Sequence, residues 1–352
     1  MESTFPAQVV IPGTFIRVQA DALITAGGIS TGNIGIVGTA SQGLGETHLF
    51  SDYRTATETV GPYDATHHLT RGLELLFRAG ARTVYARGLD PAAAAQNDFA
   101  TAFDQLVLDD VNILVAPELG TDTALAVLGP VLTTGETNSQ DMIAVIGSDE
   151  DTTAGITGQV PDNGRIVFAA PGVRAFDSDQ GAETDLSGTF TAAPVAGLLS
   201  GLAPQSSPTN KVIPGITRLA ERFSYGQNVD LVSSRVLTLE ERSGVRVIRG
   251  LTSNDGPFAQ ITTRRITDFA KAGMRSVGNP FLGRLNNERV RGALKGALAG
   301  FLDSMVENEM LISYSLEVTA TRQDEIAGRV TVNAVLRPTF SIDFIMVTLV
   351  LE

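Results

Sequence analysis

The sequence predicts an α/β protein with a covered parallel sheet, followed by a smaller α+β part, with strand arms at both ends of the chain. Short apolar runs alternate with helical patterns, as at residues 111–117, 142–146 and 166–171. Strands that are apolar throughout and separated by helices indicate a parallel sheet with helices on both faces. After about residue 228 the pattern changes to strands, two helices and a final set of strands. These two patterns and the apolar last stretch predict the fold class.

The last stretch, residues 340–351, is the strand around which the prediction is organised. Four apolar side chains fall on one face (Ile342, Phe344, Met346, Val350) and four on the other (Ile345, Val347, Leu349, Leu351). Burying eight such side chains is worth on the order of 10–20 kcal/mol, and a bare strand of this kind invites edge-to-edge aggregation. We therefore expect this chain or another chain to cover it.

The first half of the chain supplies an arm and the start of the sheet. Residues 7–19 read as two short strands around Pro12-Gly13, a break that favours an extended arm over a central strand. Residues 34–38 form a small apolar strand, and a helix begins near Ser51-Asp52. Leu73, Leu76 and Phe77 recur at helical spacing in a helix over 69–79 that Gly80 ends, and residues 83–87 form the next strand.

The remaining elements follow from the same periodicities. We expect helices at 92–107 and 123–133, a loop that leads into a helix at 191–199, and a connecting loop at 203–215. The C-terminal part is expected to hold strands at 232–239 and 245–251, helices at 263–276 and 286–308, and a hairpin of 316–321 with 330–336 that Pro338 ends.

Composition excludes several classes of protein. The net charge is −13, carried by residues 1–260 at −14 against +1 for residues 261–352, which argues against a nucleic-acid partner. The chain has no cysteine, so it forms no disulfide and no thiolate metal site. No apolar run approaches 18 residues, so we expect no membrane insertion.

The sequence holds no convincing catalytic or cofactor site. The glycine run 27–45 has neither the dinucleotide nor the phosphate-loop spacing. The three histidines are His48, His67 and His68. A serine-histidine-acid triad around them is combinatorially possible, but we expect the sequence to lack the Gly-x-Ser-x-Gly spacing of a nucleophile elbow. We therefore expect no enzyme activity, no catalytic residue and no cofactor.

Acidic pairs offer a weak alternative, because carboxylates bind calcium. Asp149-Glu150-Asp151 and Asp177 with Asp179 are acidic enough, but neither stretch has the twelve-residue loop grammar of a calcium site. Solvated acidic loops are the simpler interpretation, and Asp109-Asp110 reads as a turn before a strand. We expect no metal site.

The longest helix carries a basic cluster at its N-terminal half, namely Arg289, Arg291 and Lys295, with Arg284 just before it. The helix dipole favours acidic residues at this end, so the cluster indicates either a surface for an anionic partner or an ordinary solvated face.

Four stretches in order resemble the sheath protein of contractile tails, the family of phage tail sheaths and extracellular contractile injection systems. They are 11–18, 31–43, the pair 249–255 and 261–269, and the long helix with the three strands that follow it. The resemblance covers essentially the whole chain. The chain departs from the family in lacking the tryptophans usual near the arginine-threonine-leucine run.

The resemblance implies a fold and a domain plan. It implies a strand arm at 1–20, a subtilisin-like, non-catalytic α/β domain at 21–227, an α+β domain at 228–339 and a second arm at 340–352. In such sheaths the arms complete a sheet in neighbouring subunits. The residues carried over to that strand exchange are Val9, Val10, Ile11, Phe15, Ile16, Val18, Ile342, Phe344, Met346, Val347 and Leu349.

The resemblance also implies the partners and the role. The chain would polymerise with itself as a helical sheath around an inner tube, contact baseplate and tail-terminator proteins, and contract to drive the tube through an envelope. Arg289, Arg291 and Lys295 take the role of the tube contact. Assembly would occur in the cytoplasm, as part of a virion tail or a released particle.

Two rivals stay open at this point. An α/β enzyme, either a hydrolase or a nucleotide-binding protein, would bury residues 340–351 in its own fold. A tube or baseplate protein of the same machine is the other, although tube proteins are much shorter barrels.

Overall fold

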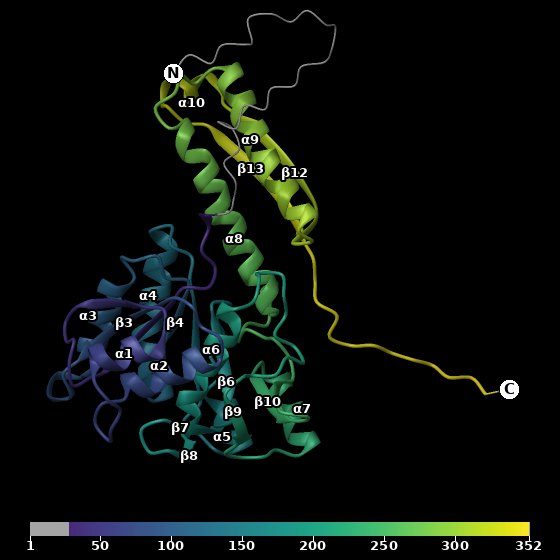
Figure 1. The fold of residues 1–352 in the computed structure, drawn as a ribbon. Coiled ribbons are helices and arrows are strands. Elements are labelled where there is room, and N and C mark those ends of the chain that lie inside the picture. Colours follow the sequence, from purple (N-terminus) through teal and green to yellow (C-terminus); the bar gives the residue numbers. More distant parts are fainter. Residues whose placement is uncertain (1–27, 352) are drawn as a thin grey trace, which may run out of the picture.

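The computed structural model describes residues 28–351, which form a body, a C-terminal module and an extended arm (Figure 1). The body is built on an eight-stranded sheet of order β11-β10-β6-β5-β4-β1-β3-β2. Its strands are β1 Ile34–Thr39, β2 Thr47–Phe50, β3 Val84–Leu89, β4 Ile113–Val115, β5 Ile143–Gly147, β6 Ile166–Ala170, β10 Leu237–Glu241 and β11 Val245–Val247. The six inner strands run parallel and the two edge strands antiparallel, which confirms the predicted parallel sheet.

Helices cover both faces of this sheet, because successive strand residues point to opposite sides. One face packs on α1 Tyr53–Val60, α2 Leu69–Arg78 and α6 Ala192–Ser200. The other face packs on α3 Gln96–Leu106, α4 Thr121–Thr137, α5 Thr153–Gly158 and α7 Tyr225–Ser233. A Cβ added at Gly197 would lie 2.6 Å from the Leu76 carbonyl oxygen, so α2 and α6 can cross this closely only with glycine there. None of the helices among residues 28–351 is long and apolar enough to span a bilayer.

Two features of the body differ from the sequence prediction. The strands expected to open the C-terminal part after residue 228 are β10 and β11 of the large sheet, where β10 pairs in parallel with β6. The sequence of a short strand does not indicate which strand it pairs with. The sequence therefore suggested that the C-terminal part begins near residue 228, before two strands that belong to the large sheet. A small second sheet, β8 Ala182–Leu186, β7 Val173–Asp177 and β9 Ile216–Leu219, was not expected as strands.

The C-terminal module spans residues 261–339 and has its own core. Helix α8 Ile261–Gly278 leaves the body, α9 Glu288–Glu307 packs against it, and the hairpin of β12 Leu311–Thr319 and β13 Thr331–Pro338 packs on α9 (Figure 1). The short α10 Arg322–Ile326 lies in the hairpin loop. A Cβ at Gly273 would lie 1.9 Å from the Phe301 ring, so glycine permits the close contact of α8 with α9. The N-cap of α9 is Asn287, whose side chain accepts from Val290 N.

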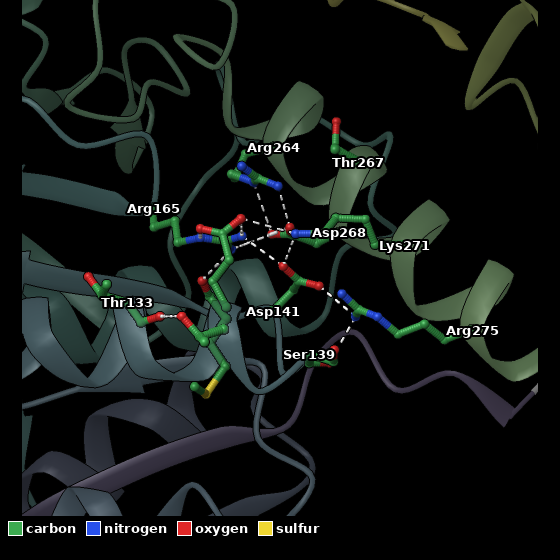
Figure 2. A network of polar contacts seen from close by, with 12 residues as sticks. Thr133, Ser139, Asp141, Arg165, Arg264, Thr267, Asp268, Lys271 and Arg275 are labelled. Carbon is green, nitrogen blue, oxygen red and sulfur yellow. Dashed lines mark hydrogen bonds and ion pairs between the residues drawn. The ribbon is translucent and has the colours of Figure 1, made fainter. Parts of the chain in front are cut away.

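One face of α8 joins the module to the body through an ionic network (Figure 2). Arg264, Asp268, Lys271 and Arg275 follow helical spacing and so share that face. The carboxylate of Asp141, between α4 and β5, is almost fully buried and accepts from Lys271, from Arg275 at 2.7 Å and from Arg165 at 2.7 Å. The body and α8 are therefore fixed to each other by charges that have little access to water.

Arg165 connects three carboxylates in this network. It contacts Glu136 at 2.8 Å, Asp141 at 2.7 Å and Asp268 at 3.2 Å, and Arg264 also pairs with Asp268. The hydrogen bond from Arg165 lowers the pKa of Glu136 to about 2, whereas burial raises the pKa of Asp268. The side chain of Glu136 on α4 is 49% exposed and that of Asp268 on α8 is 13% exposed, so water reaches the network mainly from its α4 side.

Arg265, on the neighbouring face of α8, is buried and has no carboxylate partner among residues 28–351. It donates to the carbonyl oxygens of Thr31 at 3.1 Å and Leu202 at 2.9 Å. Burial lowers the pKa of this guanidinium to about 10. The residue ties α8 to the start of the described chain and to the end of α6.

Replacing Asp141 with alanine removes the shared partner of three cations. We expect the free energy of unfolding to fall by about 3 kcal/mol, because Arg275 loses its carboxylate partner and Arg165 and Lys271 each lose one of theirs at a site with little access to water. Urea denaturation measures this loss. Asp104→Ala, at an exposed position of α3, is the matched control and should change stability by less than about 0.5 kcal/mol. Equal midpoints for the two variants would contradict the structural role of the network.

The pKa of Glu136 makes the junction sensitive to acid. Since its folded pKa of about 2 is below its ordinary value of 4.5, its contribution is complete above about pH 4.5 and is lost as the pH falls toward 2. The stability difference between the parent and Glu136→Gln should therefore shrink over that range in denaturation curves taken at successive pH values. A difference that stays constant with pH would show that Glu136 is not held ionised by Arg165.

Candidate assembly surfaces

The arm, residues 340–351, extends away from the body and the module (Figure 1). It contains no strand pairing, and within residues 28–351 no hydrogen bond or ion pair involves residues 345–351. Met346 and Leu351 are each 96% exposed and Leu349 is 84% exposed. A contiguous apolar surface of this kind marks an interaction site. The described part of this chain therefore does not bury the apolar side chains of the arm, although the sequence led us to expect that some chain does.

The root of the arm, residues 341–344, differs from its outer part. Ser341 and Asp343 turn toward the body, where Asp343 pairs with Arg249 at 2.7 Å. Ile342 and Phe344 turn outward and are 80% and 72% exposed. Polar and apolar side chains thus alternate across the root, and the surface that is apolar on both sides begins at Phe344.

The hairpin offers edges to which a strand can add. β12 and β13 pair antiparallel, with Glu317 opposite Asn333, and neither strand pairs with another described strand. Their inner face is apolar and packs on α9 through Tyr314, Leu316, Val318, Val332 and Leu336. The hydrogen bond from Tyr314 to Asp303 on α9 raises the pKa of this tyrosine to about 12. The hairpin is thus held firmly while its outer edges keep unpaired backbone groups.

A groove of about 670 Å³ lies beside the N-terminal part of β13. Its lining includes Met274, Leu282, Leu285, Val290, Leu294 and Val332. Leu282 and Leu285 are 79% and 78% exposed, so this apolar lining faces water in the single chain. A strand that added to the edge of β13 would bring side chains over it.

The basic cluster of α9 divides into two kinds of residue. Arg291 donates to Asn286 at 2.9 Å and to Glu325 at 3.0 Å, so it fastens α9 to α10. Hydrogen bonds from Arg322 and then Arg291 lower the pKa of Glu325. Arg289 and Lys295 are exposed and form no ion pair with the residues that the structure describes. Of the three basic residues of α9, Arg289 and Lys295 are therefore the two whose charges are not paired within the described part of the chain.

The histidines do not form a catalytic group. His67 pairs with Asp64 at 2.8 Å, the ring of His48 contacts the Gly43 carbonyl oxygen at 3.1 Å, and His68 packs near Phe190. Within the described range none of the three hydrogen-bonds to a serine side chain.

One Gly-x-Ser-x-Gly spacing does occur, at Gly28 to Gly32, so the expectation that the sequence lacks one was wrong. Ser30 lies before β1 instead of between a strand and a helix, and its hydroxyl donates to Asn112 at 2.7 Å. The spacing therefore does not build a nucleophile elbow.

The acidic stretches serve local structure. Asp149 accepts from the Thr121 backbone N–H at 3.1 Å and so caps α4, and Asp177 accepts from the N–H groups of Asp179 and Gln180 in a turn. In the described part of the chain no cluster of three or more His, Asp or Glu residues is arranged to hold a metal ion.

Six residues expected to exchange strands, Val9, Val10, Ile11, Phe15, Ile16 and Val18, lie outside the described residues. Sequence reasoning missed the partners of the arm root and of the α8 network. The charged residues of α8 at helical spacing and the polar pair Ser341 and Asp343 were visible in the sequence, but their partners lie about 80 to 130 residues away along the chain.

Comparisons with known proteins agree with this architecture. Residues 253–352 match the family model of the phage tail sheath C-terminal domain. No curated protein shows a significant sequence match to the chain.

Three solved structures illustrate the similarity of the whole fold. A chain of the contracted helical sheath of the anti-feeding prophage matches with a TM-score of 0.77 and 16% identity, over 97% of this chain and 99% of that one. The contracted sheath of the extracellular contractile injection system PVC gives 0.73 and 15%, over 99% of both chains. The sheath tail protein of Desulfitobacterium hafniense gives 0.69 and 12%, over 93% and 100%. By sequence, residues 253–352 match the phage tail sheath C-terminal domain, and the chain as a whole has the fold of contractile sheath proteins.

Proposed function

We propose that this chain is the structural subunit of a contractile sheath. It polymerises as a helix around an inner tube and contracts to drive that tube through a target envelope. The exposed apolar arm carries the proposal, because the described part of the chain leaves it bare in water. The family match of residues 253–352 and the fold shared with sheath proteins support the same role.

Strand exchange is the proposed means of assembly. Among the strands that the structure describes, none pairs with the arm, and the hairpin has unpaired outer edges beside an apolar groove. If the arm of one copy adds as a strand to the hairpin of another, the backbone groups of the arm and of the hairpin edge pair with each other, which is β-augmentation. Such a contact joins two different surfaces, and a heterologous contact that does not close generates a helical filament.

Residues 345–351 form the exchanged strand in this proposal, with Met346, Val347 and Leu349 as its central side chains. Ile342 and Phe344 lie in the root and flank it. The N-terminal arm, residues 1–20, is proposed as a second exchanged strand. The body is proposed to be a subtilisin-like, non-catalytic domain. The parallel sheet and the helices on both of its faces support this description.

Contraction is proposed to be a change between two packings of the same rigid subunits. The driving force is the difference in buried surface between the extended and contracted lattices, and no nucleotide is consumed. The α8 network supports this view, because it makes the body and the module rotate together. The flexible links are then the arms between copies, which keep the lattice connected.

The rival reading as an α/β enzyme is disfavoured by the arm. An enzyme with a self-contained sheet would bury residues 340–351, whereas Met346 and Leu351 are almost fully exposed. The proposed partners are further copies of the chain, the inner tube, and baseplate and terminator proteins. Assembly is proposed to take place in the cytoplasm, in a virion tail or a particle that is later released.

Leu349→Asp tests the exchanged strand. We expect a folded protein with an unchanged melting temperature that no longer forms sheath polymers, since a carboxylate cannot be buried between strands without a partner. Negative-stain microscopy and sedimentation measure polymer formation. Leu108→Asp is the matched control, since Leu108 is 79% exposed on the body, and it should polymerise like the parent. Polymers of parental length from Leu349→Asp would refute the exchange.

Arg289→Glu combined with Lys295→Glu tests the tube contact. We expect weaker co-sedimentation with preformed inner tubes, because the charge of an exposed patch is reversed while its fold is left unchanged. The double variant Arg82→Glu and Arg218→Glu changes two exposed arginines of the body and serves as the control. Equal tube binding by the two double variants would remove α9 as the tube-facing helix.

A further inference from the structure

The root of the arm is held in a set of polar contacts on the body. The carboxylate of Asp343 is only 6% exposed and accepts from Arg249 Nε at 2.7 Å, Gln260 Nε2 at 3.2 Å and Thr209 Oγ1 at 3.3 Å. We call Thr209, Arg249 and Gln260 the arm clamp. Three donors from separate stretches of the body thus converge on one carboxylate at the start of an otherwise free segment.

Gln260 also holds the backbone of the root. Its side-chain oxygen accepts from Ser341 N at 3.1 Å, and its Nε2 donates to the Ser341 carbonyl oxygen at 3.4 Å. One amide side chain therefore occupies both backbone groups of Ser341, as a paired strand residue would. In addition, the guanidinium of Arg249 lies 5.2 Å from the centre of the Phe344 ring.

The contacts of Ser341 and Asp343 lie in the short segment between β13 and the outer part of the arm. The chain would have to reverse direction in this segment if the arm paired with β13 of its own chain. β13 has eight residues, 331–338, and the segment 344–351 has eight more, separated by the five residues 339–343. Loops of up to five residues are ordinary hairpin connections. The arm could therefore fold back and pair with β13 of its own chain, which would bury both its apolar side chains and its backbone groups.

Folding back has a strong kinetic and entropic advantage over exchange. The two partners are joined by a short loop, so their effective concentration is far above that of a neighbouring copy in solution. A chain closed in this way would have a capped β13 edge and no free arm. It could neither donate a strand through this arm nor accept one at that edge.

We propose that the arm clamp prevents this self-pairing and thereby reserves the arm and the β13 edge for other copies. The inference rests on the proposed strand exchange. A hairpin loop over 339–343 has to reverse the chain at Ser341 and Asp343, and the clamp holds these two residues along the body. The segment that follows leaves the body in the direction seen in Figure 1, away from β13.

The absence of cysteine in this chain makes a clean cross-linking test possible. Leu349→Cys is combined with Asn333→Cys on β13 or with Glu317→Cys on β12, since these two positions face each other across the hairpin. Purified protein is treated with a short bismaleimide and separated under denaturing conditions. Products between chains run as ladders, and a product within one chain runs as a compact monomer.

With the clamp intact we expect ladders and almost no monomeric product. With Asp343→Ala and Gln260→Ala added, we expect at least about a fivefold rise in the compact monomer of the Asn333→Cys pair, with shorter polymers. Arg246→Ala is the matched control, because Arg246 donates to nearby backbone carbonyls of the body and not to the arm. It should cross-link like the parent.

The outcomes separate the clamp from the exchange. Ladders from the clamp variants without extra compact monomer would overturn the role of the clamp and leave strand exchange intact. A parent that already yields the compact monomer would overturn the clamp as well. A parent that yields neither product would contradict the exchange itself, and with it this inference.

Discussion

The structure depends on an apolar segment that the rest of residues 28–351 does not cover. Residues 344–351 are exposed on both faces, and burying such a strand is worth on the order of 10–20 kcal/mol. In the arrangement that the structure describes for residues 28–351, that free energy is not used. With the arm held away from β13 of its own chain, another molecule that supplies an edge makes it available, so the chain favours assembly even though its body and its module each have a core of their own.

A second constraint is the stiffness of the connection between body and module. Arg165, Asp141 and the charged face of α8 form a network that is mostly shielded from water (Figure 2). Breaking a buried network leaves charges unpaired, so the two parts move as one. In a sheath that contracts, a stiff subunit transmits rotation of the body to the hairpin and from there to the next copy.

The sequence allowed the parallel sheet and its covering helices to be predicted, because both depend on periodicity along the chain. The expectation that residues 340–351 form a strand remains a prediction, since the structure shows no strand there. The sequence did not reveal that β10 and β11 join the large sheet, since the sequence of a strand of three to five residues does not indicate which strand it pairs with. The network at α8 and the arm clamp were missed for a similar reason. Asp141 with Lys271, and Arg249 with Asp343, are paired by the fold across about 90 to 130 residues. The cluster Arg289, Arg291 and Lys295 looked uniform in the sequence, and only the structure shows that Arg291 is engaged with Glu325.

The central claim is that the arm is bare in the single chain and covered in the assembly. Hydrogen–deuterium exchange of the backbone amides of residues 345–351 measures this directly, in the monomer and in assembled particles. The account predicts exchange at nearly the rate of an unstructured peptide in the monomer and strong protection in particles, together with new protection at an edge of the hairpin. Equal exchange of the arm in the two states would contradict it.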